Sequence, residues 1–543
     1  MSVPFGLGSR RLDHLGLVAG MYDELGVGEL FDELIVQDHE RRTVSVGQAV
    51  KAMVLNGLGF TNRTLYLAAH FFRNRPTERL IGPGIEPEHL HDDTLGRALD
   101  ELYAHDVTLL FSLISAQAVE RLGLKGGIGH LDATCFHLHG AYRGDEEAQE
   151  DGGVVEITHG YSRDHRPDLV QVGLNLIVEH RARLPLWMQP VDGNCNDKQG
   201  FGEVIEQHVG QLQARHGIDY WVADSALYSA DNLRRLSAQP VKWITRVPET
   251  LKLAVEKLDA LVGVQGQTLA PGYRGRSVEV EYAGVRQRWL VVTSVAALQR
   301  GVKSVDRQLL KDSQSEFNVW QKLTRRRFAC QTDAQQELEQ LQRQLKVLAL
   351  EAPQVVAVRQ HAQAGRPAPG VEPQVVGYEL QGHPYLDPNL RLLRLMRKAA
   401  FIIATNELDE KVLSNERLLL VYKGQQNVER GFRFLKDPMF QASNFYLKSP
   451  QRIMALLMVM TLCLLVYAAL EYRLRQRLEQ SKEQFPDQKG KLIDRPTMRW
   501  VFQYFQGIDL LLLPGQPDTV VNRDGHHILV LQLLGSSYEQ LYS

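Results

Sequence analysis

One apolar segment limits how this chain can fold more than any other feature of its sequence. Residues 453–470 read IMALLMVMTLCLLVYAAL, in which only Thr461 is clearly polar. A run of this length reaches that of a membrane span, but a helix buried in a large α/β core has the same composition. The run is the only one of its kind in the sequence and has charged residues on both sides. We therefore expect a core helix and no membrane partner, with a membrane-anchored protein as the alternative.

Length and composition set the broad class of the protein. A chain of 543 residues is too long for one hydrophobic core, so we expect about two to four domains. Apolar residues make up 44% and charged residues 23%, which is ordinary for a globular protein. The net charge of −2 argues weakly against binding to nucleic acid by overall charge, although local basic patches could still contact phosphates.

Cysteine usage and the N-terminus carry little functional signal. The four cysteines lie far apart without CxxC spacing, so neither a zinc site nor a disulfide framework is expected, and a reducing compartment fits. The first residues, MSVPFGLGSRRLDHLG, lack the charged and apolar regions of a secretory signal. The sequence thus favours a cytoplasmic protein.

Residues 1–125 predict a helical domain. Apolar residues recur at helical spacing in LDHLGLVAGMYDELGVGELFDELI and in VSVGQAVKAMVLNGLGF. The cluster at residues 92–94 predicts the N-cap of a further helix. Short helices joined by tight turns are typical of a helix-turn-helix-like DNA-binding module. A plain helical bundle fits the same pattern equally well.

Residues 126–249 change to the periodicity of strands. GGIGHLDATCFHLHG alternates and puts His130, Asp132 and Thr134 on one face, and the two strand-like runs that follow form a hairpin. A helix, a strand ending at Asp224, another helix and a strand containing Trp243 come next. The resulting series β-β-β-α-β-α-β predicts a mixed sheet with helices on both faces, in the order of the ribonuclease-H-like fold.

The rest of the chain divides into three further parts. Residues 250–398 predict a mixed α+β insertion, residues 399–480 return to the core, and residues 481–543 form a C-terminal tail. Two final strands are expected in that tail, in TVVNRDG and HHILVLQLL. The predicted fold is therefore a multidomain α/β protein whose ribonuclease-H-like core is interrupted by the insertion and preceded by a helical domain.

Carboxylates on two of the predicted strands suggest a metal site. Asp132 lies in the middle of a strand, and Asp224 lies at the C-terminal end of another, where open α/β sheets place their sites. A buried carboxylate is costly unless it is paired or binds a metal. With a third acid nearby, such residues would form an oxygen-rich pocket for Mg²⁺ or Mn²⁺. A turn or capping role is the alternative for each Asp taken alone.

A later segment, YKGQQNVERGFRFLK, predicts a helix that could supply the third acid. Tyr422, Gln425, Glu429 and Lys436 fall near one face of such a helix at 100° per residue. The alternative is an amphipathic helix with a solvated basic face.

These segments together resemble a known family. Glu429 and its neighbours are similar to the Tyr-x2-Arg-x3-Glu-x6-Lys signature of insertion-sequence-4-type transposases, and HLDAT and VADSALYS resemble the segments around that family's two aspartates. HGYSRDHRPDLVQ and YKGQ-x2-VE-x2-FR-x-LK look like the insertion-sequence-1634 branch. The resemblance spans about residues 125–470. Gln425 departs from it, because the broader signature has Arg there.

The resemblance implies a DDE-type DNA transposase that cuts at terminal inverted repeats and transfers the freed 3′-OH ends into target DNA. Asp132, Asp224 and Glu429 would be catalytic and would hold two Mg²⁺ or Mn²⁺ ions. A homodimer on DNA is implied, because two DNA ends must be handled together, and so is a nucleoid-associated location in a prokaryote. The alternatives are a catalytically inactive DNA-binding regulator and a nuclease that never joins strands.

Further residues are candidates for DNA contact. Tyr422, Gln425 and Lys436 match or replace signature positions, and Arg433 could supply the phosphate contact expected of the signature arginine. Other candidates are Arg163 and Arg166 in a polar loop, Trp243 as a stacking platform, and the basic runs at residues 322–327 and 389–398.

Each of these candidates has an ordinary structural alternative: a charged turn for the loop, a core position for Trp243, and solvated helix faces for the basic runs. A zinc role for His130, His137 and His139 is less favoured than ordinary polar strand positions.

Overall fold

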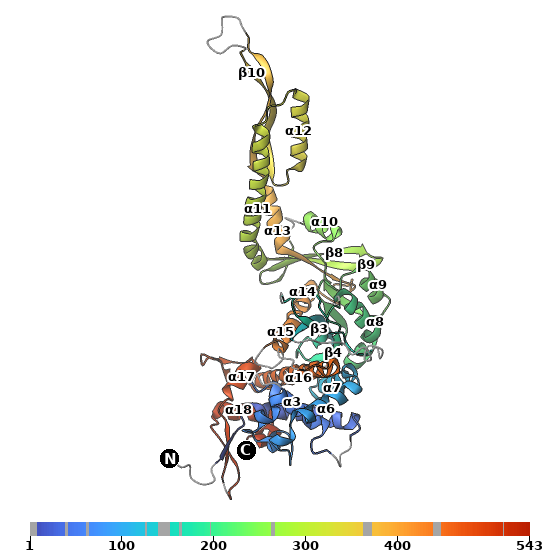
Figure 1. Cartoon of the computed structure of the whole chain (residues 1–543), viewed down its shortest axis with the longest axis vertical. Coiled ribbons are helices and arrows are strands. Elements are labelled where there is room, and N and C mark those ends of the chain that lie inside the picture. Colours follow the sequence, from blue (N-terminus) through green and yellow to red (C-terminus); the bar gives the residue numbers. More distant parts are fainter. Residues whose placement is uncertain are drawn as a thin grey trace.

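The structure is a computed structural model of the whole chain. It describes residues 8–37, 42–60, 65–124, 127–139, 153–161, 166–195, 197–261, 266–361, 372–437, 447–513 and 515–543. Three parts stand out in Figure 1: a helical body that holds the first described strand and the C-terminus, a sheet in the middle, and an arm that extends away from the sheet.

The N-terminal region is helical, as its periodicity predicts. The described helices are α1 (Leu15–Glu24), α2 (Val27–Leu34), α3 (Val46–Gly57), α4 (Ala68–Phe72), α5 (Thr77–Leu80), α6 (Asp92–Ala104) and α7 (Val107–Arg121), with short 3₁₀ turns at Leu65–Leu67 and Pro87–His89. Ser45 begins α3 with a capping box to Gln48. The N-cap of α6 is His91, one residue before the predicted cluster, and its ring accepts a hydrogen bond from the backbone N–H of Thr94.

The long apolar segment forms the central helix of this body. It lies in α16 (Pro450–Ser481), and 89% of its most apolar window is buried. α16 packs against α1, α3, α6, α7 and the C-terminal α18 (Gly525–Leu534). By length and composition alone, α16 is the one described helix that could cross a membrane by itself. The helices α6 and α7 would qualify only as a single span, and they are bent by 91° where they meet. The apolar surface is covered by protein, as expected of a core helix.

The C-terminal segment completes the same body. Its described elements are β13 (Phe485–Pro486), β14 (Leu492–Ile493), α17 (Met498–Tyr504), β15 (Asp509–Leu512), β16 (Thr519–Val521), α18 and α19 (Ser536–Leu541). The N-terminal strand β1 (Gly8–Arg11) pairs antiparallel with β15. Tyr542 donates a hydrogen bond to the carbonyl of Asp13. Residues at the two ends of the chain therefore share one hydrophobic core.

One predicted strand in this segment is wrong. HHILVLQLL was expected to be a strand, but it is α18. Asp524 starts the helix with a capping box, in which its carboxylate accepts hydrogen bonds from the backbone N–H groups of His526 and His527. His527 Nδ1 in turn accepts from the backbone N–H of Asp524. An apolar run of this length fits either a strand or a buried helix, and the cap selects the helix.

The middle of the chain forms a mixed nine-stranded sheet, in the order β4-β3-β2-β5-β6-β12-β9-β8-β7. The strands are β2 (Ile128–Leu138), β3 (Val170–Glu179), β4 (Pro185–Val191), β5 (Tyr220–Ala223), β6 (Lys242–Arg246), β7 (Gln267–Ala270), β8 (Tyr273–Tyr282), β9 (Val285–Ser294) and β12 (Ala400–Thr405). β2, β3 and β4 are antiparallel neighbours, whereas β2, β5 and β6 run parallel. The predicted mixed sheet is confirmed.

Helices cover both faces of this sheet. On β5, Trp221 and Ala223 pack in one apolar cluster with residues of α8 (Asp197–His216) and α9 (Ala230–Ser237). Val222 points to the opposite face and packs with α14 (Asn415–Lys423). The alternation of apolar residues along the strand therefore feeds two separate cores.

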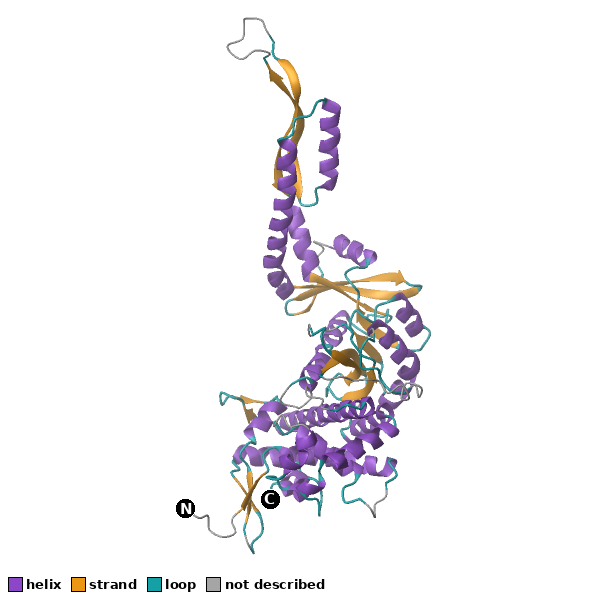
Figure 2. Cartoon of the chain, in the orientation of Figure 1, coloured by secondary structure: helices purple, strands orange, loops and turns teal. Residues whose placement is uncertain are grey.

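The predicted insertion at residues 250–398 needs a correction. After α10 (Lys252–Leu261), strands β7, β8 and β9 extend the central sheet, and β9 pairs with β12 along the whole length of β12. The part that leaves the sheet comprises α11 (Val295–Thr324), α12 (Gln331–Gln344), β10 (Leu348–Gln360), β11 (Gln374–Leu386) and α13 (Pro388–Ala399). These elements form the arm, whose two-stranded ribbon is β10 and β11 (Figure 2).

Candidate active site

Two of the predicted acidic residues lie on neighbouring parallel strands. Leu131 of β2 is in register with Ala223 of β5, so Asp132 and Asp224 each follow by one residue at the same level of the sheet. Both side chains are half-buried. Asp132 Oδ1 accepts a hydrogen bond from the backbone N–H of Ala133, and Asp224 Oδ1 accepts one from Ala226. The register of β2 with β5 thus places the two carboxylates on adjacent strands, with Asp132 inside β2 and Asp224 directly after β5. The side chain of Asp224 also forms a turn with Ala226.

A third strand brings an arginine to the same level. Ala223 is in register with Thr245 of β6, and Arg246 is the next residue. The hydroxyl of Thr245 donates to the carbonyl of Asp224 at 2.6 Å, which ties the two strand ends together. Sequence reasoning missed Arg246. The rule that selected Asp224, a polar residue at the C-terminal end of a parallel strand, would have selected Arg246 as well.

The helix predicted over YKGQQNVERGFRFLK is two helices. α14 ends at Lys423 and α15 (Gln426–Leu435) follows, with Gly424 and Gln425 between them in right-handed helical conformation. The N–H of Gln425 donates to the carbonyl of Tyr422, three residues back rather than four. Tyr422 and Glu429 therefore come from successive helices, and Lys436 is the C-cap residue of α15.

α15 lies along β2, and contacts at both of its ends fix its direction. At its start, Gln425 contacts His130 and Leu131, and at its end the Lys436 ammonium lies 5.8 Å from the centre of the Phe136 ring. The helix and the strand therefore run in the same direction. Glu429 stands about 6 Å beyond Gln425 along the helix, and Asp132 stands about 7 Å beyond His130 along the strand. Glu429 thus falls alongside Asp132, and its side chain is exposed.

The pKa of the Tyr422 hydroxyl reflects the charges around the candidate site. Burial raises the pKa of its hydroxyl to about 12, and the negative charges of Asp224 and Glu429 act in the same direction. The Arg246 guanidinium opposes that rise. Tyr422 is therefore within electrostatic reach of two candidate carboxylates and of the arginine, and it stays protonated near neutral pH.

Two residues proposed from the sequence for DNA contact are buried, which corrects both predictions. Trp243 is 0% exposed in the core between the sheet and its helices, so it offers no face to a base. Gln425 is 6% exposed, and its amide is used inside the protein. Its Nε2 donates to the carbonyl of Leu131 at 2.8 Å, and its Oε1 lies 3.1 Å from His130 Nδ1.

The remaining candidates for DNA contact lie at the surface or outside the described residues. Arg433 is exposed near the end of α15, and Lys436 is half-buried. Arg166 is exposed and forms a bidentate ion pair with Asp168, which lowers the pKa of that carboxyl to about 2. Arg163 lies outside the described residues.

The histidines near Asp132 have different surroundings. His130 is fully buried, and its Nε2 lies 2.9 Å from Nδ1 of His180, the residue after β3. Burial lowers the pKa of His130 to about 3, and the neighbouring His180 contributes to that shift. His137 is half-buried and His139 is exposed. His130 is therefore a buried histidine of β2 that is hydrogen bonded within the protein.

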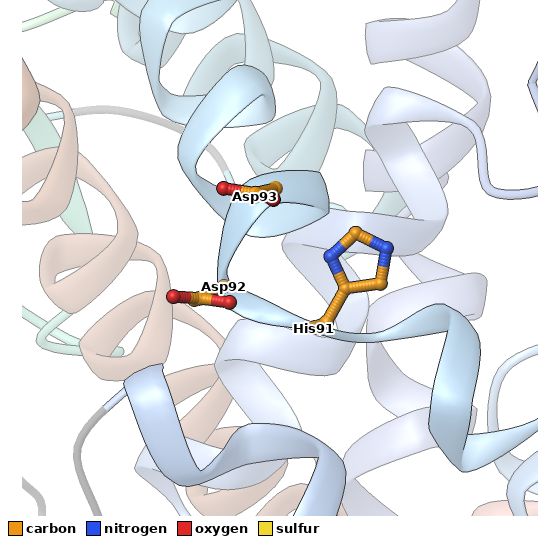
Figure 3. Close-up of side chains that lie close together, drawn as sticks. All are labelled: His91, Asp92 and Asp93. Atoms are coloured by element: carbon orange, nitrogen blue, oxygen red, sulfur yellow. The ribbon is translucent and has the colours of Figure 1, made fainter.

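Within the described ranges, three metal-ligating side chains come within 4.8 Å of one another at one place, which is away from the sheet. His91, Asp92 and Asp93 form that group, all exposed, at the N-terminus of α6 (Figure 3). Their positions are explained by helix capping and by the attraction of carboxylates to a helix N-terminus. Asp132, Asp224 and Glu429 are neighbours by register and helix position, but they are more widely spaced than this group.

Comparison with protein-family models gives two matches. Residues 124–466, more than half of the chain, match the family described as Transposase DDE domain. Residues 7–116 match the family described as Domain of unknown function (DUF4277). No curated protein matches the chain.

One solved structure, a piggyBac transposase synaptic complex with hairpin DNA, aligns over 92% of this chain and 82% of that chain. The two are 11% identical with a TM-score of 0.38, a likeness too weak to carry an argument.

Proposed function

The chain belongs to the Transposase DDE domain family, and from this premise we propose that it is a metal-dependent DNA transposase with a ribonuclease-H-like core. The observation that carries the proposal is the register of β2 with β5, which sets Asp132 beside Asp224 while α15 runs along β2 with Glu429. The three antiparallel and two parallel strands at this end of the sheet support the ribonuclease-H-like assignment. We further assign the chain to the insertion-sequence-4 superfamily, in its 1634-type branch, on the motifs of the sequence.

The side chains of the site fit divalent metal ions of the hard, oxygen-binding type. Asp132, Asp224 and Glu429 offer carboxylate oxygens, which Mg²⁺ and Mn²⁺ prefer. The proposed pair of ions would lower the pKa of an attacking water or 3′-OH and would neutralise the charge that develops on the leaving oxygen. Asp132, within β2, and Asp224, just after β5, each accept a hydrogen bond from a nearby backbone N–H group, which restrains the two side chains.

Other residues around the carboxylates would contact the phosphates of the DNA backbone. Arg246 and the protonated Tyr422 lie within reach of the acidic residues and can donate to a phosphate oxygen. Arg433 and Lys436 on α15, and Arg166 beside the sheet, are proposed to hold the strands near the site. The reaction would then be cut-and-paste transposition: cleavage at terminal inverted repeats, followed by attack of the 3′-OH ends on target DNA. We expect a homodimer on DNA in the cytoplasm of a prokaryote.

The proposal is tested by cleavage of DNA that carries the inverted repeats flanking the gene. Wild-type protein should break the repeat ends only with Mg²⁺ or Mn²⁺, and Asp132→Asn, Asp224→Asn and Glu429→Gln should abolish the breaks. Glu479→Gln is the matched control, because Glu479 is an exposed acid on the last turn of α16. Specific binding to the ends by folded protein, without cleavage under any metal condition, would refute the catalytic function and favour a DNA-binding regulator. Breaks without strand transfer would favour a nuclease.

A further inference from the structure

A buried polar cluster joins the start of α15 to β2. His130 is 0% exposed and Gln425 is 6% exposed, and the two side chains are hydrogen bonded to one another. His180 contacts His130 from the other side, and the side-chain amide of Asn427 donates to the carbonyl of His180 at 3.3 Å. The cluster therefore connects β2, the end of β3 and the first turn of α15.

The hydrogen bonds of the cluster have one direction. Gln425 Nε2 donates to the carbonyl of Leu131, so Oε1 is the atom that faces His130 Nδ1, and His130 must donate there. His130 Nε2 is then the acceptor in the neutral ring, and His180 Nδ1 donates to it. Only this assignment of donors and acceptors satisfies all three hydrogen bonds at once. The contact between α15 and β2 is therefore fixed by hydrogen bonding as well as by packing.

The backbone at Gly424 packs tightly against the imidazole rings of His130 and His180. A Cβ added to Gly424 would lie 2.5 Å from both Cε1 and Nδ1 of His180 and 2.9 Å from Cε1 of His130. The backbone between α14 and α15 thus rests directly on the two rings. Because Gln425 holds the carbonyl of Leu131, the residue before Asp132, the helix is fixed to the strand at a defined level.

His130 and Gln425, the two residues of this contact, each lie close in sequence to a candidate metal ligand. Asp132 follows His130 by two residues, so both side chains leave β2 on the same face. Glu429 follows Gln425 by four residues, so it stands about one helical turn further on. A shift of α15 along β2 would move Glu429 relative to Asp132 by the same amount.

We propose that His130 and Gln425 are positioning residues, whose hydrogen bond fixes α15 on β2 and so sets Glu429 against Asp132 for metal binding. The inference rests on the proposed function, since it assigns the cluster a role in that same site. It also gives Gln425 a purpose where the family signature has Arg. An arginine in this nearly closed space beside His130 would bury an additional charge, which is costly, whereas an amide supplies both a donor and an acceptor.

The test measures Mn²⁺ binding to the full chain by electron paramagnetic resonance, together with hydrogen exchange of the α15 amides. Gln425→Met keeps the side-chain length but removes both hydrogen bonds, and the double variant His130→Leu with Gln425→Met removes both polar partners. The double variant leaves no unpaired His130 donor facing position 425, whereas Gln425→Met alone does. In both variants the Leu131 carbonyl loses its side-chain donor, and in the double variant half-buried His180 Nδ1 loses its acceptor. Ser115→Ala is the matched control: it removes a buried hydrogen bond between α7 and β4, outside the cluster.

The expected result is a loss of about tenfold or more in Mn²⁺ affinity for Gln425→Met, with faster exchange confined to α15. The double variant should melt at a higher temperature than Gln425→Met and yet keep the weakened Mn²⁺ binding, which a purely structural role would not produce. Mn²⁺ affinity and α15 exchange equal to the wild type in both variants would overturn the positioning role. A wild type that binds Mn²⁺ no better than Glu429→Gln would instead overturn the proposed function, and the positioning role with it.

Discussion

Substitution of Gly424 by alanine isolates the fit between α15 and the two imidazoles. The backbone at this position has φ −61° and ψ −16°, a helical conformation that alanine adopts without strain. The new methyl group would nevertheless lie 2.5 Å from the His180 ring, where ordinary contacts begin at 3.4 Å. The helix or the ring must therefore move by about 1 Å, which is enough to lengthen the hydrogen bond between His130 and Gln425.

The size of the effect follows from these contacts. Overpacking costs about 1–3 kcal/mol, and the higher helix propensity of alanine offsets up to about 1 kcal/mol of that cost. A net cost of about 1–2 kcal/mol would raise the exchange rates of the α15 amides about 5- to 30-fold, if the helix opens locally. Exchange suits this chain better than a global unfolding free energy, because a chain with several cores need not unfold as one unit.

Gly210→Ala is the control for this prediction. Gly210 is exposed within α8, and a Cβ there would meet nothing within 4 Å. It should leave α15 unchanged and stabilise α8 by a few tenths of a kcal/mol to about 1 kcal/mol. If α15 exchanges in Gly424→Ala at the wild-type rate, within about threefold, the tight contact with His180 is not present in solution and the argument for α15 fails.

Three other perturbations test separate parts of the structure. Leu462→Ala, at a 0% exposed position of α16, should destabilise the helical body by about 2–5 kcal/mol in thermal or denaturant unfolding, and an unchanged transition would contradict a core role. Burial lowers the pKa of His14 to about 4, so its contribution to stability is complete above pH 6.5 and is lost as pH falls toward 4. Unfolding at pH 6.5 and pH 5 should differ by about 2 kcal/mol more in the wild type than in His14→Gln, and equal differences would refute the burial argument. Replacing residues 295–398 by Asn-Gly should preserve the sheet, because Thr293 and Ala400 are cross-strand partners and a short turn can join them. Loss of cooperative folding in this variant would show that the arm supports the core.

Periodicity along the chain was enough to predict the local elements that carry the site. The alternation around Asp132 and the short apolar run ending at Asp224 identified two strands, and their order with the intervening helices predicted a mixed sheet. Such patterns are readable because burial on one face of a strand or helix repeats every few residues. The same reasoning failed for HHILVLQLL, whose apolar residues fit both periods until the Asp524 cap is considered.

Pairing between distant segments could be decided only by the tertiary structure. Register between β5 and β6 brought Arg246 beside Asp224, and a buried hydrogen bond turned Gln425 from a candidate DNA contact into part of the core. The strands β7, β8 and β9 also pair into the central sheet, and the N-terminal and C-terminal segments both pack against α16. The sequence by itself determined which faces must be buried, because that depends on local spacing. It could not determine which partner buries them, because many apolar surfaces are chemically alike and only their joint packing selects one arrangement.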